Sequence, residues 1–161
     1  MTVNRVRFVF VVACLLASYA QAEEAPDAKA LPLVEQNISQ VCFGCICEAI
    51  SGCDTTAGCT GDVCGPFGIT WAYWSDGGKP TLNGEPSNAD GAFGRCTRDP
   101  FCSSKAIQGY MNRFAQDCNG DGVINCDDYV RIHRHGGYGC SAPLDPKYEN
   151  AYRNCTQTFG K

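Results

Sequence analysis

The chain has 161 residues, a formal net charge of −4, 44% hydrophobic residues and 13 cysteines. A chain of this length normally forms one domain with a modest core. The acidic balance disfavours a general affinity for nucleic acid or anionic lipid, and with it the class of cationic proteins that attack bacterial membranes.

Residues 1–22 predict a cleavable signal peptide. A basic start precedes an apolar run over residues 8–17, and the segment ends in Ala20-Gln21-Ala22. The run is shorter than the ~20 residues of a membrane-spanning helix, so we expect cleavage and secretion, not a membrane anchor. Residues 23–161 then carry 11 Lys and Arg against 17 Asp and Glu, a net charge of −6.

Twelve cysteines remain behind the signal peptide, and an even number in an exported chain predicts six disulfides. The cluster Cys42-x-x-Cys45-x-Cys47 would be a candidate zinc site in a cytosolic protein. The export signal favours disulfides over zinc here.

Residues 23–38 are polar, contain two prolines and show no helical or strand period. We predict a flexible leader there, followed by one folded domain over residues 39–161. Asn37 opens an Asn-Ile-Ser glycosylation sequon at the end of the leader. Asn154 opens a second sequon, but its middle residue, Cys155, would hinder modification once it is paired.

The segment from Ser39 to Gly52 predicts a helix of two to three turns, because a capping residue precedes a short apolar run and a glycine ends it. Cys42, Cys45 and Ile46 would share one face of this helix. The next residues, 53–74, are rich in Gly, Thr and aromatic side chains without a helical period, which predicts short strands and turns.

Residues 77–94 contain too few apolar side chains for anything but a long loop. Residues 103–117 predict the most regular helix, with apolar residues at three- and four-residue steps behind a serine cap at Ser103. A shorter helix is predicted from Cys126 to His135, before two glycines. We expect the remainder to be a mixed tail that cysteines attach to the domain.

The sequence DCNGDGVINCDD, between the last two helices, is similar to an EF-hand-like calcium loop, and more closely to that of dockerin modules. Oxygen-bearing side chains at alternate positions, the carbonyl of residue 123 and a glycine at the turn, Gly122, could surround a hard cation. The alternative is a solvated acidic turn. We predict a structural calcium ion with the ligands Asp117, Asn119, Asp121, Val123 and Asp128, the last standing where the usual ligand is a longer glutamate.

The motifs CFGCICEAISGC, CGPFGI, AYWSDGG, QGYMNRFA and HGGYGC, in this order, resemble the invertebrate-type lysozyme (destabilase) family over roughly residues 40–155. The resemblance implies a small, disulfide-rich α+β domain with short helices, a small antiparallel sheet and a substrate cleft. It also implies hydrolysis of the β-1,4 bonds between N-acetylmuramic acid and N-acetylglucosamine in bacterial peptidoglycan. That chemistry requires no cofactor, and we expect a secreted monomer without nucleic-acid or membrane partners.

The resemblance further implies three short-range disulfides, Cys47–Cys53, Cys59–Cys64 and Cys96–Cys102. The other six cysteines could pair in several ways, and their pairing stays open: Cys42, Cys45, Cys118, Cys126, Cys140 and Cys155. Many relatives have one further bridge, whose two positions correspond to Gly77 and Ala106 in this chain.

Glycoside hydrolysis needs one carboxylic acid to protonate the leaving oxygen and one carboxylate at the developing positive centre. By the resemblance, the acid stands at the position of Ile50. Glu48 lies two residues earlier, about 200° around a helix, and should face away from the cleft. The second carboxylate corresponds to Asp62, in a loop that is shorter than in the family and closed by Cys64.

We therefore predict that hydrolysis is reduced or lost. One alternative is an active lysozyme with another carboxyl as the acid, such as Glu48 on an irregular helix. Another is a non-catalytic, calcium-stabilised binding module. The isopeptidase activity of some destabilases is also in question, because the serine proposed for it belongs to the missing loop segment and Thr70 replaces a lysine of the family.

Binding of glycan could persist without hydrolysis. An aromatic cluster with one acceptor, which could bind sugar rings or could simply fill the core, is formed by Trp71, Tyr73, Trp74 and Asp76. His133 and His135 are expected to be solvated helix residues. Arg131 and His133 match the family pattern, so contact with an anionic group of the substrate is also possible.

Overall fold

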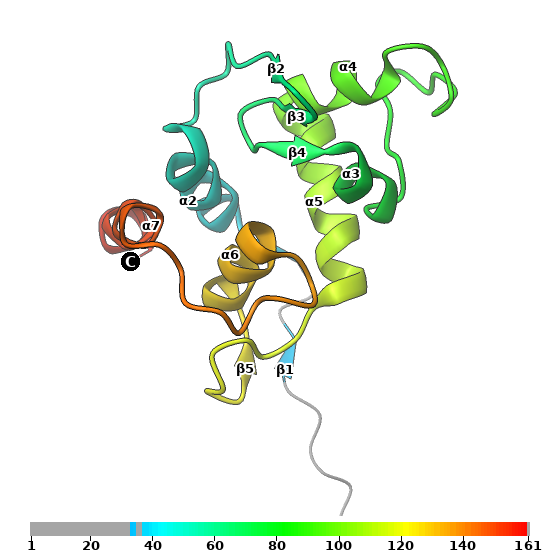
Figure 1. The fold of residues 1–161 in the computed structure, drawn as a ribbon. Helices are drawn as coiled ribbons and strands as arrows, with labels where there is room; N and C mark the ends of the chain where they lie inside the picture. Colours follow the sequence, from blue (N-terminus) through cyan, green and yellow to red (C-terminus); the bar gives the residue numbers. More distant parts are fainter. Residues whose placement is uncertain (1–32, 35–36, 161) are drawn as a thin grey trace, which may run out of the picture. The chain divides into compact units, whose positions relative to one another are not determined.

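The computed structural model describes residues 33–34 and 37–160. The predicted signal peptide and most of the predicted leader lie outside these residues. The described part of the chain contains six helices, a three-stranded antiparallel sheet and a two-stranded parallel pair (Figure 1). The predicted α+β class, with short helices and a small antiparallel sheet, is confirmed. Within the described residues, no helix has the length and apolar character needed to cross a bilayer.

The first predicted helix is confirmed as α2, Gln40–Ser51. The hydroxyl of Ser39 caps it by accepting the backbone N–H of Cys42, and Gly52 ends it in the left-handed conformation that glycine tolerates best. The three side chains predicted to share one face, including Cys45 and Ile46, are all buried.

The predicted short strands are β2 (Cys59–Thr60), β3 (Val63–Cys64) and β4 (Ile69–Thr70), in the order β2-β3-β4. Cys59 and Cys64 are direct partners in the register, which brings the two ends of a disulfide together. The prediction that the strand region continues to residue 74 is wrong, because α3 (Trp71–Asp76) begins directly after β4. The hydroxyl of Thr70 caps this short helix by accepting the N–H of Tyr73.

The predicted loop 77–94 ends at residue 91, where α4 (Ala92–Arg98) begins. Helix α5 (Pro100–Phe114) starts three residues before the predicted cap, because Asp99 accepts the N–H of Cys102 and Pro100 occupies the first turn. Ser103 is not the cap: it is fully buried and its hydroxyl donates to the carbonyl of Asp99.

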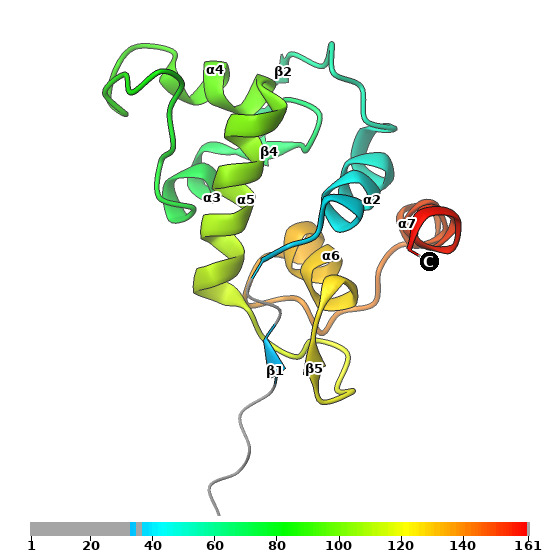
Figure 2. The ribbon, with the colours of Figure 1, turned by 180° about the vertical axis from the view of Figure 1, so that it is seen from behind.

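Helix α6 has the predicted bounds, Cys126–His135, and Asn125 caps it. The predicted mixed tail is instead largely helix α7, Pro146–Phe159, with Asp145 as its cap. Figures 1 and 2 show α7 beside α2, and its buried face carries Tyr148 and Tyr152.

Part of the predicted leader belongs to the folded unit. Leu33–Val34 form strand β1, which pairs in parallel with β5, Val123–Ile124. Ile38 is buried, and its backbone N–H donates to the side-chain oxygen of Gln108 on α5. The folded unit therefore begins before Ser39.

Residues 37–160 contain six disulfides, and the three that the family resemblance implies are confirmed. The three whose pairing was open are Cys42–Cys126, Cys45–Cys155 and Cys118–Cys140. The first two join residues 84 and 110 apart in sequence, and closing loops of that size in the unfolded chain is worth about 4–5 kcal/mol each in the chain-entropy account. They attach α2 to α6 and α7.

Gly77 and Ala106, the two positions of the bridge found in many relatives, are adjacent in space. A Cβ on Gly77 would lie 2.2 Å from the carbonyl oxygen of Ala106, and a Cβ on Gly109 would lie 2.2 Å from the carbonyl oxygen of Gly77. The end of α3 therefore meets α5 backbone against backbone, in a contact that only glycine permits at these positions.

We predict that Gly109→Ala destabilises the protein by about 1–3 kcal/mol, because the new methyl group would overlap a backbone carbonyl that cannot rotate away. Thermal melting measures the loss. The control is Gly44→Ala on α2, where no heavy atom lies within 4 Å and helix propensity should add up to about 1 kcal/mol of stability. Equal melting temperatures for the two variants would contradict the close packing.

Candidate functional site

The position implied for the catalytic acid lies against the small sheet. Ile50, in the last turn of α2, is half-buried, and its Cγ2 would be 3.1 Å from a Cβ on Gly68 in the β3–β4 turn. Cγ1 of Val63 lies 3.5 Å from the same point. Asp62, directly before Val63, is exposed in the β2–β3 turn. A hydrocarbon side chain thus packs against the β3–β4 turn, and Asp62 lies in the turn at the other end of the short strand β3.

Glu48 lies on another side of α2. It is exposed and lines a hollow of about 760 Å³ between α2 and α7, together with α7 residues that include Ala151 and Phe159. Glu48 therefore lies on the side of α2 that borders α7, while Ile50 packs against the β3–β4 turn. This separation is what two residues of helical rotation produce.

The predicted aromatic cluster does not form one surface. Trp74 is 1% exposed, and Tyr73 stacks on Tyr110 with ring centroids 3.8 Å apart. Asp76 accepts a hydrogen bond from Arg113. Trp71 is 55% exposed, and of the four predicted residues it is the one whose ring is open to a ligand. The other members take part in packing or in hydrogen bonds within the protein, because successive residues of α3 point in different directions.

The prediction of a solvated His133 is wrong. Its side chain is buried between α6, α3 and the sheet, with Nε2 2.8 Å from the carbonyl oxygen of Phe67 and Nδ1 3.0 Å from the hydroxyl of Tyr73. A carbonyl oxygen only accepts, so Nε2 carries the proton and Nδ1 accepts from Tyr73. Burial lowers the pKa of His133 to about 4. The neutral imidazole positions the turn against which Ile50 packs.

His135 is half-buried, which the sequence did not indicate either. In the described part of the chain, its Nε2 has no hydrogen-bond partner. No hydrogen bond joins its side chain to Asp62 among the described residues.

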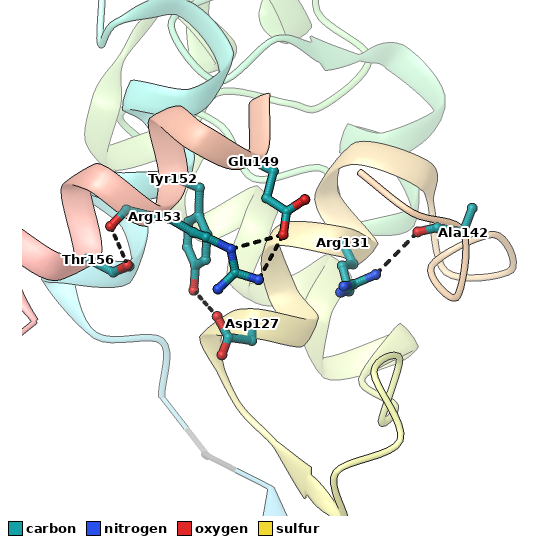
Figure 3. A network of polar contacts seen from close by, with 7 residues as sticks. All are labelled: Asp127, Arg131, Ala142, Glu149, Tyr152, Arg153 and Thr156. Carbon is teal, nitrogen blue, oxygen red and sulfur yellow. Dashed lines mark hydrogen bonds and ion pairs between the residues drawn. The ribbon is translucent and has the colours of Figure 1, made fainter. Parts of the chain in front are cut away.

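Arg131 belongs to the α6–α7 contact (Figure 3). Its guanidinium donates to the carbonyl of Ala142, and beside it the hydroxyl of Tyr152 donates to Asp127 and Arg153 pairs with Glu149. Arg131 also lines a hollow of about 140 Å³ with these charged neighbours. Of these contacts, the hydrogen bond from Tyr152 to Asp127 joins α7 to α6, and Asp62 does not line this hollow.

The side chains of the predicted calcium loop accept hydrogen bonds from the loop itself. Asp117 accepts the backbone N–H groups of Gly120, Asp121 and Gly122, and these bonds lower its pKa. Asp128 is buried, which raises its pKa, and its two oxygens accept N–H groups of Cys118 and Asn125.

The carboxylates predicted to bind calcium do not gather around one point in the structure. Asn119 and Asp121 bond to each other and to neighbouring amides, and Val123 belongs to β5. Over residues 33–34 and 37–160, no three acidic, histidine or cysteine side chains gather as a metal site requires. In this arrangement the residues do not fit a calcium ion, and calcium binding stays a prediction.

Comparisons with known proteins agree with this architecture. A model of the Destabilase family matches residues 39–155. A lysozyme of Magallana gigas is 37% identical over 71% of this chain and 77% of its own length, and invertebrate-type lysozyme 2 of Caenorhabditis elegans is 32% identical over 91% and 97%. Meretrix lusoria lysozyme, solved in complex with Aeromonas hydrophila PliI, superposes with a TM-score of 0.59 at 29% identity, covering 76% of this chain and 94% of that one.

We predict that His133 makes the stability pH-dependent. Its pKa is about 4 in the folded protein and near 6.5 when unfolded, so below pH 6.5 the unfolded chain takes up a proton that the folded chain does not. The free energy of unfolding should fall by about 3 kcal/mol as the pH is lowered from 6.5 to 4. Denaturant unfolding measures it. In His133→Gln this component should be absent, whereas His135→Gln should keep it.

The raised pKa of Asp128 has the opposite effect on stability: because the folded chain holds this proton more tightly than the unfolded chain, stability rises as the pH falls. It is common to all three proteins, so the difference between wild type and His133→Gln isolates the histidine. Parallel pH profiles for these two proteins would show that His133 is not held neutral by burial.

The calcium prediction is tested by titration calorimetry. If the loop takes the ion, calcium gives a heat of binding that Asp117→Asn removes, and a chelator lowers the melting temperature. Melting that is unchanged by both calcium and chelator contradicts the prediction. Glu149→Gln, which changes a carboxylate outside the loop, is the matched control.

Proposed function

This chain belongs to the destabilase family of invertebrate-type lysozymes, and from that premise we propose that it is a secreted protein that binds bacterial peptidoglycan and hydrolyses it weakly or not at all. The observation that carries the second half of the proposal is Ile50, a hydrocarbon side chain packed against the β3–β4 turn at the position that the family resemblance implies for the proton donor. The six disulfides support the proposed export to an oxidising environment.

The chemistry of glycoside cleavage explains why this position matters. The leaving sugar oxygen departs as an alcohol when a carboxylic acid protonates it, and as a much poorer alkoxide leaving group when none does. Loss of general acid catalysis costs on the order of 10²–10⁴ in rate. Asp62 alone can stabilise positive charge at the anomeric carbon, but it cannot act as nucleophile and acid at the same step.

The orientation of Glu48 speaks against the alternative of an active enzyme with a displaced acid. It lies on the side of α2 that borders α7, and α2 is regular from Gln40 to Ser51. Bringing Glu48 to the sheet edge would require the helix to rotate, and the disulfides of Cys42 and Cys45 hold it in place. A calcium-stabilised module without a glycan ligand is the remaining alternative, and binding to insoluble peptidoglycan distinguishes it.

We predict that Ile50→Glu raises the rate at which the purified protein clears bacterial cell walls by about 10² or more, because it places a carboxylic acid at the position that the family resemblance implies for the proton donor. The matched control is Ile50→Gln, which has the same shape without an acid and should leave the rate at the wild-type level. Ile50→Glu combined with Asp62→Asn should lose the gain. Melting curves establish that each variant is folded.

Two results would overturn the proposal. Rapid clearing by the wild-type protein would show that another group supplies the proton. Absence of wild-type binding to insoluble peptidoglycan would remove the proposed ligand altogether.

A further inference from the structure

A further hollow lies between α3, α4 and the loop that joins them. It has a volume of about 430 Å³ and is lined by Trp71, Trp74, Lys79 and residues 87–94. Figures 1 and 2 show α3, α4 and α5 together, with α2 and α7 in a separate group. No lining residue of this hollow belongs to α2 or to the β2–β3 hairpin, so it is distinct from the site of Ile50 and Asp62.

An exposed tryptophan and a lysine stand together at this hollow. The ring of Trp71 is 55% exposed, and Nζ of Lys79 lies 5.2 Å from its centroid. Among the described residues, Lys79 has no carboxylate within ion-pairing distance. Its charge is therefore compensated only by the face of an aromatic ring, and it can still pair with an anionic ligand.

The backbone at Lys79 is held in a conformation that side chains rarely adopt. Its φ is +52°, which costs about 1 kcal/mol or more and persists only where the surroundings impose it. Trp74 imposes it from both sides: its carbonyl accepts the N–H of Lys79, and its indole N–H donates to the carbonyl of Pro80. Trp74 is itself fixed, because its ring is buried against Phe93.

The opposite wall of the hollow is a preformed polar loop. The guanidinium of Arg95 on α4 donates to both carboxylate oxygens of Glu85, and the hydroxyl of Thr81 donates to the carbonyl of Glu85. These hydrogen bonds hold the loop in place. Its exposed hydroxyl, amide and carboxylate side chains that line the hollow are those of Ser87, Asn88 and Asp90.

We propose that this hollow is a second glycan-binding site, which takes an N-acetylated sugar of peptidoglycan together with a carboxylate of the peptide attached to it. The sugar ring lies against the open part of the Trp71 ring, because the C–H faces of pyranoses match flat aromatic surfaces. The carboxylate pairs with Lys79, and the loop side chains hydrogen-bond to the amide and hydroxyl groups. The inference rests on the proposed function and deepens it, because binding here does not depend on any catalytic acid.

The experiment measures binding of the full chain to insoluble peptidoglycan and to chitin, a neutral polymer of N-acetylglucosamine. Trp71→Ala should lower the affinity for both polymers by about ten-fold, since it removes the stacking surface. Lys79→Gln should lower the affinity for peptidoglycan by about three-fold and reduce its dependence on salt. It should leave chitin binding unchanged, so the preference for peptidoglycan falls.

Two matched controls lie on α5, outside the hollow. Phe101→Ala removes a side chain that is 81% exposed, and Lys105→Gln removes an exposed positive charge; both should bind like the wild type. If the wild type binds peptidoglycan and Trp71→Ala and Lys79→Gln bind equally well, or no worse than these controls, the second site is wrong while the proposed function stands. If the wild type does not bind peptidoglycan, the proposed function itself fails.

Discussion

The two long-range disulfides on one face of α2 are the constraint on which the rest of this structure depends. Cys42 and Cys45, one turn apart, attach α2 covalently to α6 and α7. Because the helix can neither slide nor rotate, each of its other faces has a fixed neighbour: Glu48 faces α7, and Ile50 faces the β3–β4 turn. Buried His133 holds that same turn from α6 through the carbonyl of Phe67. The identity of the side chain at position 50 thus decides the chemistry of a site whose geometry the framework supplies.

Catalysis and binding make different demands on such a framework. Proton donation depends on one side chain within hydrogen-bonding reach of the scissile oxygen, so one substitution can remove it. Binding of a polymer spreads over several contacts, none of which is indispensable. A glycan-binding surface built from α3 and α4 is therefore independent of the acid position on α2. If hydrolysis is reduced or lost as proposed, such a surface would let the protein remain on the cell wall.

Local signals in the sequence predicted the elements that capping residues and cysteines define. Ser39 and Gly52 bounded α2, the bounds of α6 were correct, and the short-range disulfides followed from the family resemblance. Helix α7 was missed although Asp145-Pro146 is a capping signature, because its polar and aromatic composition shows little apolar periodicity. Helix α3 is too short for any period to be visible. The burial of His133 depends on Phe67, 66 residues away in sequence, so no local pattern reports it. For the same reason the four aromatic and acidic residues of α3, read as one cluster, separate into core and surface positions.

The contact between α3 and α5 lies next to the surface that carries Trp71 and Lys79. At the C-cap of α3, Gly77 lies so close to α5 that a side chain at this position would meet the carbonyl of Ala106. A cysteine pair at these positions would need more space between the helices, since each Cβ requires room of its own. Gly77 directly precedes the corner at which Lys79 turns over Trp71, and hydrogen bonds from residues 77 and 78 back to α3 fix where that corner begins. The backbone contact at Gly77 therefore also helps to fix the position of the Trp71–Lys79 pair. The close approach of Gly77 to α5 and the exposed Trp71 beside Lys79 thus belong to one corner of the structure.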